Sequence, residues 1–214
     1  MANSAMVKYS TRVLSADDPE ALAEAVDLLR TGQVVAFPTD TVYGIGVHAF
    51  IAEAVALLYK VKERPPDKFI PLLVSDNGDL SGITESVPDL AWRLTERFWP
   101  GALTLVLPKA PSVPTIVSAG PGVAVRAPDH AVARMLIRAL GAPLATTSAN
   151  LSGGSNPVTA ADVLTQLGGR IPLILDGGPC PGGMPSTVLD LTQSPPRILR
   201  EGGIPADMLE KFWA

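Results

Sequence analysis

The chain alternates between short apolar runs and longer segments in which apolar residues recur every three or four positions. Short apolar runs indicate buried strands, and the longer spacing indicates helices with one apolar face. Clear examples are the runs at residues 34–37 and 70–74 and the helical spacing over residues 131–140. Repeated alternation of the two patterns predicts an α/β protein in which helices cover a sheet.

Local signals place the ends of these elements. Asp18 before Pro19 is typical of a helix start, and Gly32 is typical of its stop. Further helices are predicted over residues 53–62, 88–98, 131–140, 160–167 and 205–212. Strands are predicted over residues 34–37, 42–47, 70–74, 103–107, 123–126, 144–146, 173–175, 188–191 and 198–199. The strands are short and their connections rich in Pro and Gly, which favours a mixed sheet. No Ser/Gly linker divides the chain, so one domain is expected over 1–214, with a core of about 19–204.

Composition narrows the classes of function. The 214 residues carry 17 Lys and Arg against 21 Asp and Glu, a net charge of −4, which argues against binding driven mainly by phosphate backbones. Cys180 is the only cysteine, and His48 and His130 are the only histidines, so we predict no intrachain disulfide and no metal ligands. The sequence contains no apolar span and no secretory apolar segment, so a cytoplasmic location without membrane contact is expected.

Common catalytic motifs are absent from the sequence. It contains no phosphate-binding P-loop, no nucleophile elbow and no zinc-protease motif. Gly44, Gly46 and Ala49 match the loose G-x-G-x-x-A pattern of dinucleotide-binding proteins. These glycines fall in a predicted extended segment rather than at a helix start, which disfavours that interpretation.

Three cations, Lys62, Arg64 and Lys68, surround Pro65 and Pro66 just past a predicted helix. The prolines impose an irregular, stiff backbone, and cations on such a loop suit a polyanion such as a triphosphate. The alternative is a solvated helix end whose cations complement the helix dipole. Spacing alone does not decide between the two.

A polar loop at residues 146–156 follows a short apolar strand and precedes a helix. Its hydroxyls, amides and unhindered backbone N–H groups lie where open α/β sheets bind ligands, at the carboxyl end of a strand. The alternative is an ordinary turn with a helix cap, because Ser, Asn and Gly dominate turns.

Arg126 ends an apolar strand, where burying it without an anion is costly. Its planar fork suits a carboxylate or phosphate of a ligand, and an internal salt bridge is the alternative. The hydroxyl-rich turn at residues 39–44 either lines a pocket or only reverses the chain. Cys180 has no histidine nearby in the sequence to activate it, and we interpret it as incidental.

Taken together, the ordered motifs over residues 34–203 resemble the YrdC family of threonylcarbamoyl-AMP synthases. The motifs are FPTDTVYG at 37–44, K-x-R at 62–64, FWPG at 98–101 with LT at 103–104, VR-x-P at 125–128, S-x-N at 148–150, PSTV at 185–188 and R-x-G at 200–202. The combination is far more specific than any one of these motifs.

The resemblance implies a single YrdC-like α/β domain with a twisted mixed sheet and a deep open cleft. It implies a nucleotidyltransferase that joins L-threonine, bicarbonate and ATP, with Mg²⁺, into L-threonylcarbamoyladenylate and pyrophosphate. Separate tRNA threonylcarbamoyl transferase proteins would then use this product to form N6-threonylcarbamoyladenosine in tRNA, and a weak RNA contact is also implied. Because the chain ends soon after Gly203, the short single-domain form is expected.

The resemblance also assigns roles to residues. The catalytic signature falls on Lys62, Arg64, Ser148 and Asn150. ATP-binding residues are Arg64, Lys68, Gly122, Ser148, Asn156 and Arg200. Threonine-binding residues are Thr41, Leu73, Arg126, Thr146 and Ser186. The chain departs from the family pattern at His48, where an acidic or amide residue is common, and at Phe69, where proline is common.

Two other functions are compatible with the same residues. One is an RNA-binding module that uses the basic rim of the cleft, although the sequence shows no basic stripe with aromatic stacking residues. The other is a related enzyme that forms a different acyl- or carbamoyl-adenylate.

Overall fold

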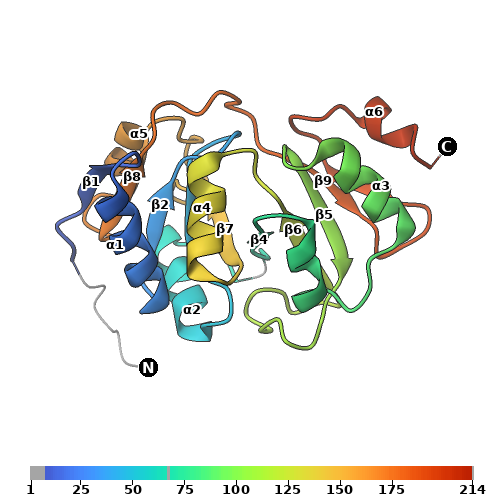
Figure 1. Cartoon of the computed structure of the whole chain (residues 1–214), viewed down its shortest axis with the longest axis horizontal. Helices are drawn as coiled ribbons and strands as arrows, with labels where there is room; N and C mark the ends of the chain where they lie inside the picture. Colours follow the sequence, from blue (N-terminus) through green and yellow to red (C-terminus); the bar gives the residue numbers. More distant parts are fainter. Residues whose placement is uncertain (1–7, 67, 214) are drawn as a thin grey trace.

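A single ten-stranded sheet organises the computed structural model, which describes residues 8–66 and 68–213 (Figure 1). The strands are β1 (Arg12–Ser15), β2 (Val35–Phe37), β3 (Gly44–His48), β4 (Leu72–Leu73), β5 (Leu103–Pro108), β6 (Gly122–Arg126), β7 (Leu144–Ser148), β8 (Leu173–Asp176), β9 (Thr187–Asp190) and β10 (Arg197–Arg200). Their order across the sheet is β1-β8-β2-β3-β7-β4-β6-β5-β9-β10. The central strands are therefore contributed by widely separated parts of the chain.

The sheet is mixed, which confirms the prediction. β1 with β8, β8 with β2, β4 with β6, and β5 with β9 are parallel. The other neighbouring pairs are antiparallel. The short turn between β2 and β3 can only join antiparallel neighbours, whereas parallel neighbours need a long crossover.

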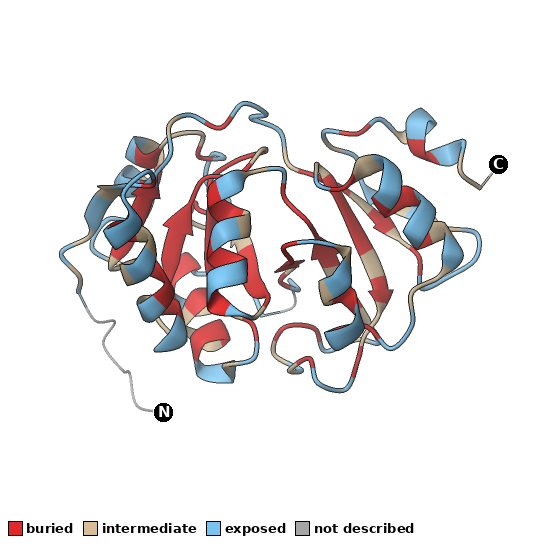
Figure 2. Ribbon diagram, viewed as in Figure 1, coloured by how far each residue is buried: buried red, intermediate tan, exposed pale blue. Residues whose placement is uncertain are grey.

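Helices cover both faces of the sheet. They are α1 (Pro19–Arg30), α2 (Ala52–Lys62), α3 (Asp89–Phe98), α4 (Ala131–Leu140), α5 (Ala160–Leu167) and α6 (Ala206–Glu210), with a short 3₁₀ helix η1 (Asn77–Gly82). Val35 and Phe37 of β2 pack in a buried cluster with α1 and α4, whereas Ala36 packs in a second cluster with α2 and α5. Successive strand residues thus face opposite sides, and the inward faces of the helices are buried with them (Figure 2).

Capping interactions fix the helix ends, and the start of α1 at Asp18 and Pro19 is the predicted one. The Asp18 carboxylate accepts from the Glu20 backbone N–H at 2.9 Å, and Pro19 begins α1. α4 occupies the predicted residues and ends at Gly141, whose φ of +74° is the left-handed conformation that glycine adopts readily. α5 also occupies its predicted residues and begins with a capping box in which Thr159 and Asp162 bond to each other's backbone.

Two elements were not expected from the sequence. β1 is an edge strand with mostly exposed residues, and its Arg-Val-Leu-Ser sequence contains no sustained apolar run. η1 is six residues long and mostly polar, and it begins at an Asp76 side chain that accepts from Gly78 N. Gly44 and Gly46 lie inside β3, so the predicted extended conformation of that segment is confirmed.

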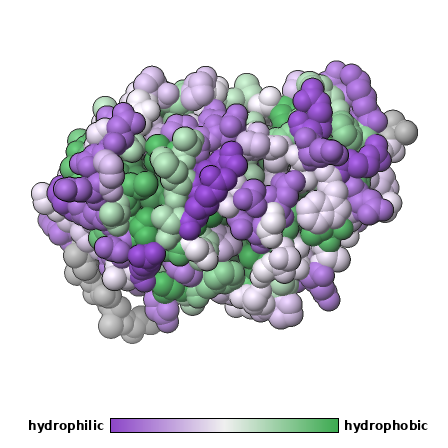
Figure 3. Space-filling view, in the orientation of Figure 1, coloured by the Kyte–Doolittle hydropathy of each residue, from purple (hydrophilic) through white to green (hydrophobic). Residues whose placement is uncertain are grey.

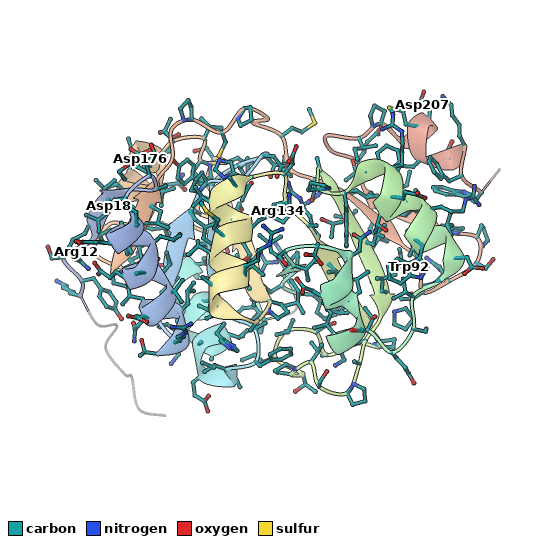
Figure 4. The ribbon with its side chains drawn as sticks, viewed as in Figure 1. Arg12, Asp18, Trp92, Arg134, Asp176 and Asp207 are labelled. Carbon is teal, nitrogen blue, oxygen red and sulfur yellow. The ribbon has the colours of Figure 1, made fainter. Side chains whose placement is uncertain are left out.

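The connection after β4 is tied to a helix from a distant part of the chain. Arg134 of α4 extends toward η1 (Figure 4), and its Nε donates to the Ser75 backbone oxygen at 3.0 Å. Ser75 in turn donates from its backbone and its hydroxyl to the Asp79 carboxylate. This network fixes the end of β4, next to which the cavity described below opens.

The described helices are short, and the surface mixes polar and apolar side chains. Hydrophilic and hydrophobic side chains are intermixed on the face in Figure 3. The longest helix in the described parts of the chain, α1, has 12 residues, whereas crossing a bilayer takes about 20. None of the described helices is long and apolar enough to cross a membrane.

Gly46 allows two side chains to pack against the backbone of β3. A Cβ at this position would lie 2.8 Å from Thr146 Oγ1 and 3.1 Å from Phe37 Cε1. We therefore expect Gly46→Ala to lower the free energy of unfolding by about 1–3 kcal/mol through overpacking, as measured by urea denaturation. The control is Gly82→Ala, where a Cβ meets no atom within 4 Å. Equal destabilisation by both substitutions would contradict this account.

Candidate active site

A cavity of about 380 Å³ opens on one side of the sheet centre. Six strands that are adjacent in the sheet contribute side chains to its wall, in the order β7, β4, β6, β5, β9 and β10. Residues two apart on β5 and β6, such as Thr104 and Val106 or Ala124 and Arg126, face the cavity, while the intervening Leu105 belongs to the buried core. The period-two alternation of strands therefore separates the cavity wall from the core.

Loops complete the cavity wall. The lining residues are Thr39, Thr41, Val42, Tyr43, Gly44, Arg64, Phe69, Pro71, Leu73, Thr104, Val106, Ala124, Arg126, Thr146, Thr147, Ser148, Asn156, Pro185, Ser186, Val188, Leu199 and Arg200. Nine residues that the sequence analysis assigned to a site are among them: Thr41, Arg64, Leu73, Arg126, Thr146, Ser148, Asn156, Ser186 and Arg200. Segments separated by more than a hundred residues thus converge on one cavity, and the individual roles of these residues remain predictions.

Arg126 is held by three partners around the cavity. Its Nη2 pairs with Asp40 Oδ1 at 2.5 Å, its Nη1 donates to Thr41 Oγ1 at 2.9 Å, and its Nε donates to the Gly101 oxygen at 2.8 Å. Both charged side chains are largely buried, 8% and 14% exposed. The internal salt bridge that the sequence analysis left open is therefore present. Arg126 nevertheless lines the cavity, so the salt bridge and a contact to a ligand are compatible.

Arg200 braces the opposite wall. Its Nη2 donates to the Ser186 backbone oxygen at 2.8 Å and to Ser186 Oγ at 3.3 Å. Ser186 Oγ also shares a hydrogen bond of 2.7 Å with Thr104 Oγ1. Burial lowers the pKa of Arg200, and repulsion by Arg126 and Arg64 lowers it further. The mutual repulsion indicates a positive potential that an anionic ligand would relieve.

Arg64 stiffens the proline-containing loop at the cavity mouth. Its Nη2 donates to the Phe69 backbone oxygen at 2.6 Å, and its Nε donates to the Lys68 backbone oxygen at 3.1 Å. Arg64, Arg126 and Arg200 all line the cavity, and the described lining residues include no Asp or Glu. Such a surface attracts anions.

Lys62 lies outside the cavity lining and supports the polar loop. Its ammonium, 1% exposed as a residue, donates to the backbone oxygens of Ser148 and Asn150. The Lys62 oxygen also accepts from Ser152 N at 3.0 Å. Burial, with a smaller contribution from nearby Arg64, lowers the pKa of Lys62 to about 7. In this structure Lys62 therefore holds the loop that carries Ser148.

Three other predicted residues also lie outside the lining. Asn150 is buried, and its Nδ2 donates to the Leu151 and Gly154 oxygens, which folds the polar loop back on itself. Lys68 is exposed. Gly122 begins β6, where a Cβ would lie 2.8 Å from Val106 Cγ1. Its lack of a side chain therefore serves strand packing.

Several lining residues were not assigned from the sequence. Thr104, Val106, Ala124 and Phe69 are examples, whereas the turn at residues 39–44 does line the cavity, as one of its two interpretations predicted. The alternation along the strands was a usable signal, because the small residues Thr104 and Ala124 each lie between two apolar residues that belong to the core. Which neighbouring strands meet is set by the tertiary structure, so the signal could not identify a shared cavity.

No metal cluster is built from the protein's own side chains in the part of the chain that is described. No group of three or more His, Cys, Asp or Glu residues converges there. Mg²⁺ commonly binds through substrate phosphates and water with few protein ligands. The cavity is therefore compatible with Mg²⁺ that arrives on a nucleotide.

Comparison with protein families identifies relatives over most of the chain. The family model Sua5_yciO_yrdC, with the description "Telomere recombination", matches residues 27–202. A threonylcarbamoyl-AMP synthase of Bacillus subtilis is 45% identical over 202 residues, which cover 94% of this chain and 58% of the relative. A putative threonylcarbamoyl-AMP synthase of Mycobacterium tuberculosis is 41% identical over 204 residues, covering 93% of this chain and 94% of the relative.

Solved structures show the same fold. Pyrococcus abyssi Sua5 complexed with L-threonine superposes with a TM-score of 0.91 and 39% sequence identity, covering 95% of this chain and 61% of that one. The chain thus spans about three fifths of the length of the Bacillus and Pyrococcus relatives.

The buried pair of Arg126 and Asp40 gives a stability prediction. Asp40→Asn leaves the Arg126 guanidinium without a countercharge, and we expect it to lower the free energy of unfolding by about 3 kcal/mol in urea denaturation. The control is Asp27→Asn, which breaks the exposed pair with Arg30 and should change stability by less than about 1 kcal/mol. A similar small effect of both substitutions would refute a buried, energetically important pair.

The lowered pKa of Lys62 gives a pH prediction. Lys62 loses its proton on folding between pH 7 and its ordinary pKa of 10.5, so the unfolded state holds more protons and stability rises with pH in that window. The stability of the natural chain minus that of Lys62→Met should rise by about 2 kcal/mol from pH 7 to pH 9 in urea denaturation. The same comparison with exposed Lys60→Met should stay flat. A flat difference for Lys62→Met would disprove the shift.

Proposed function

Because this chain belongs to the Sua5–YciO–YrdC family, we propose that it joins L-threonine, bicarbonate and ATP into L-threonylcarbamoyladenylate and pyrophosphate. The observation that carries the proposal is the single cavity in which Arg64, Arg126 and Arg200 meet hydroxyls of the Thr39–Thr41 turn and of Ser148. Cations suit a triphosphate and a carboxylate, and the hydroxyls suit the polar groups of an amino acid and of a nucleotide. The names of the relatives from Bacillus and Mycobacterium support the same reaction.

The reaction needs positioning and charge neutralisation rather than a protein nucleophile. The threonine amine attacks the carbon of bicarbonate, water leaves, and a carbamate forms. A carbamate oxygen then attacks the α-phosphorus of ATP, and the bond to pyrophosphate breaks. Holding the reactants together removes much of the entropic barrier, and fixed cations stabilise the charge that builds up on the leaving group. This transfer of an adenylyl group makes the enzyme a nucleotidyltransferase.

The two substrates occupy different walls in this proposal. The amino-acid side comprises Thr41, Leu73, Arg126, Thr146 and Ser186. The nucleotide side comprises the lining residues Arg64, Ser148, Asn156 and Arg200, with Lys68 and Gly122 beyond the cavity lining. Lys62 and Asn150 act from behind, by holding the loop of Ser148. The phosphates of ATP would bring Mg²⁺ into the cavity, where the ion would neutralise part of their charge alongside Arg64 and Arg200.

The product defines the next step. An acyl-adenylate-like anhydride is hydrolysed by water, so it requires a prompt acceptor. We propose that tRNA threonylcarbamoyl transferase proteins in the cytoplasm take the threonylcarbamoyl group for adenosine in tRNA. Any RNA contact of this chain itself is weak, in keeping with its net charge of −4.

Release of pyrophosphate tests the reaction. With ATP and bicarbonate present, release should depend on L-threonine, and other amino acids should support it poorly. Equal release with many amino acids would instead indicate a related adenylate-forming enzyme. Salt-sensitive RNA binding without pyrophosphate release would indicate an RNA-binding module.

Paired arginine variants test the assignment of the two walls. Arg126→Lys keeps the charge beside Asp40 but loses the planar fork, so we expect the KM for L-threonine to rise about tenfold with little change in the KM for ATP. Arg64→Lys should do the reverse. Steady-state kinetics in which either variant affects both substrates equally would refute the assignment.

A further inference from the structure

Two threonines on the turn between β2 and β3 form a hydrogen-bonded relay beside Arg126. Thr39 Oγ1 and Thr41 Oγ1 lie 3.0 Å apart, and each residue is 3% exposed. Thr39 Oγ1 donates to the Val42 backbone oxygen at 2.7 Å and accepts from Thr41 N at 3.2 Å. Arg126 Nη1 lies 2.9 Å from Thr41 Oγ1. The relay therefore links the turn to the arginine.

The bonding capacity of Thr39 is fully used within the turn. A hydroxyl has one proton to donate and two lone pairs to accept with. The single proton of Thr39 goes to the Val42 oxygen, so Thr41 must be the donor in the contact between the two hydroxyls. Both lone pairs of Thr39 are then occupied, by Thr41 N and by the Thr41 hydroxyl. Thr39 consequently has no hydrogen-bonding capacity left for a ligand, although it lines the cavity.

The same reasoning fixes which hydrogen bonds the Thr41 hydroxyl donates and which it accepts. Arginine is a donor only, so Thr41 Oγ1 accepts from Arg126. Its proton is directed to Thr39, which leaves one lone pair. Thr41 can therefore offer only an acceptor to the cavity. A ligand atom that bonds to it must carry a proton, as an amine does and an ionised carboxylate does not.

Arg126 provides the complementary donors. Its three hydrogen bonds within the described chain use one N–H each, on Nε, Nη1 and Nη2. A guanidinium has five N–H groups, so two remain for a carboxylate. Thr41 and Arg126 thus present one acceptor and a pair of donors side by side, which matches the amine and carboxylate of an α-amino acid.

We propose that Thr39 is a positioning residue that directs the Thr41 proton away from the cavity, so that Thr41 Oγ1 accepts from the α-amino group of the substrate. The proposal rests on the proposed function, because it names the orientation of the amino acid in that same site. The amine then lies against Thr41 and the carboxylate against Arg126. A hydrogen bond from an N–H of the neutral amine leaves the nitrogen lone pair free to attack carbon.

Two substitutions separate this role from simple packing. Thr39→Val keeps the shape but removes the hydroxyl, so the Thr41 proton is free to turn toward the cavity. Thr39→Ser keeps the hydroxyl. Calorimetry on the full chain should show L-threonine affinity about tenfold or more weaker in Thr39→Val and close to natural in Thr39→Ser. ATP affinity should be unchanged in both variants. A merely structural defect would instead weaken the binding of both ATP and L-threonine.

A ligand without the amine tests the hydrogen bond to Thr41 on the natural chain itself. 3-Hydroxybutyrate retains the carbon chain, hydroxyl and carboxylate of threonine but lacks the amine. The natural chain should bind it about tenfold or more weakly than L-threonine, and Thr39→Val should narrow that ratio.

Three results would overturn the inference while the proposed function stands. The first is an unchanged L-threonine affinity in Thr39→Val. The second is an equal loss of ATP affinity and L-threonine affinity in that variant. The third is equal binding of L-threonine and 3-hydroxybutyrate by the natural chain. If Thr39→Val does not fold, the comparison of the two ligands on the natural chain decides. Absence of L-threonine binding by the natural chain, with ATP present, would instead refute the proposed function and the inference with it.

Discussion

The cavity side of the sheet depends on the hydrogen bonds and the salt bridge made by the Arg126 guanidinium. Arg126 ends β6 at the sheet centre, where burial of an unpaired charge would be costly. Asp40, Thr41 and the Gly101 oxygen meet it from two other segments. Because each partner is needed to satisfy the charge, the turn after β2 and the loop after α3 are held at fixed positions around the cavity. The salt bridge therefore builds the site as well as stabilising it.

The other cations are fixed in a similar way, by backbone oxygens rather than by carboxylates. Arg64 bonds to the oxygens of its own loop, Arg200 to that of Ser186, and Lys62 to those of the polar loop. Carbonyl partners hold a cation in place without cancelling its charge. The cavity is thereby preorganised for an anion, and little rearrangement is needed when one binds.

Local sequence predicted the elements whose signals are local. α4 and α5 occupy the predicted residues because apolar spacing, Gly141 and the Thr159 cap all agree. β1 was missed because an exposed edge strand needs no apolar run, and its pairing with β8 joins residues far apart in the sequence. The same limit applied to the cavity, since Thr104 and Ala124 become lining residues only when β5 and β6 take their places at the sheet centre.

The sequence by itself determined the fold class, the family motifs and the set of polar and cationic side chains available for chemistry. It could not assign Lys62 and Arg126, two buried basic residues that each fall in a family motif, to different positions relative to the cavity. Only the tertiary structure decided that Arg126 lines the cavity while Lys62 holds the loop from outside it. The physical reason is that residue type sets what a side chain can bind, whereas long-range strand pairing sets which partners come within reach.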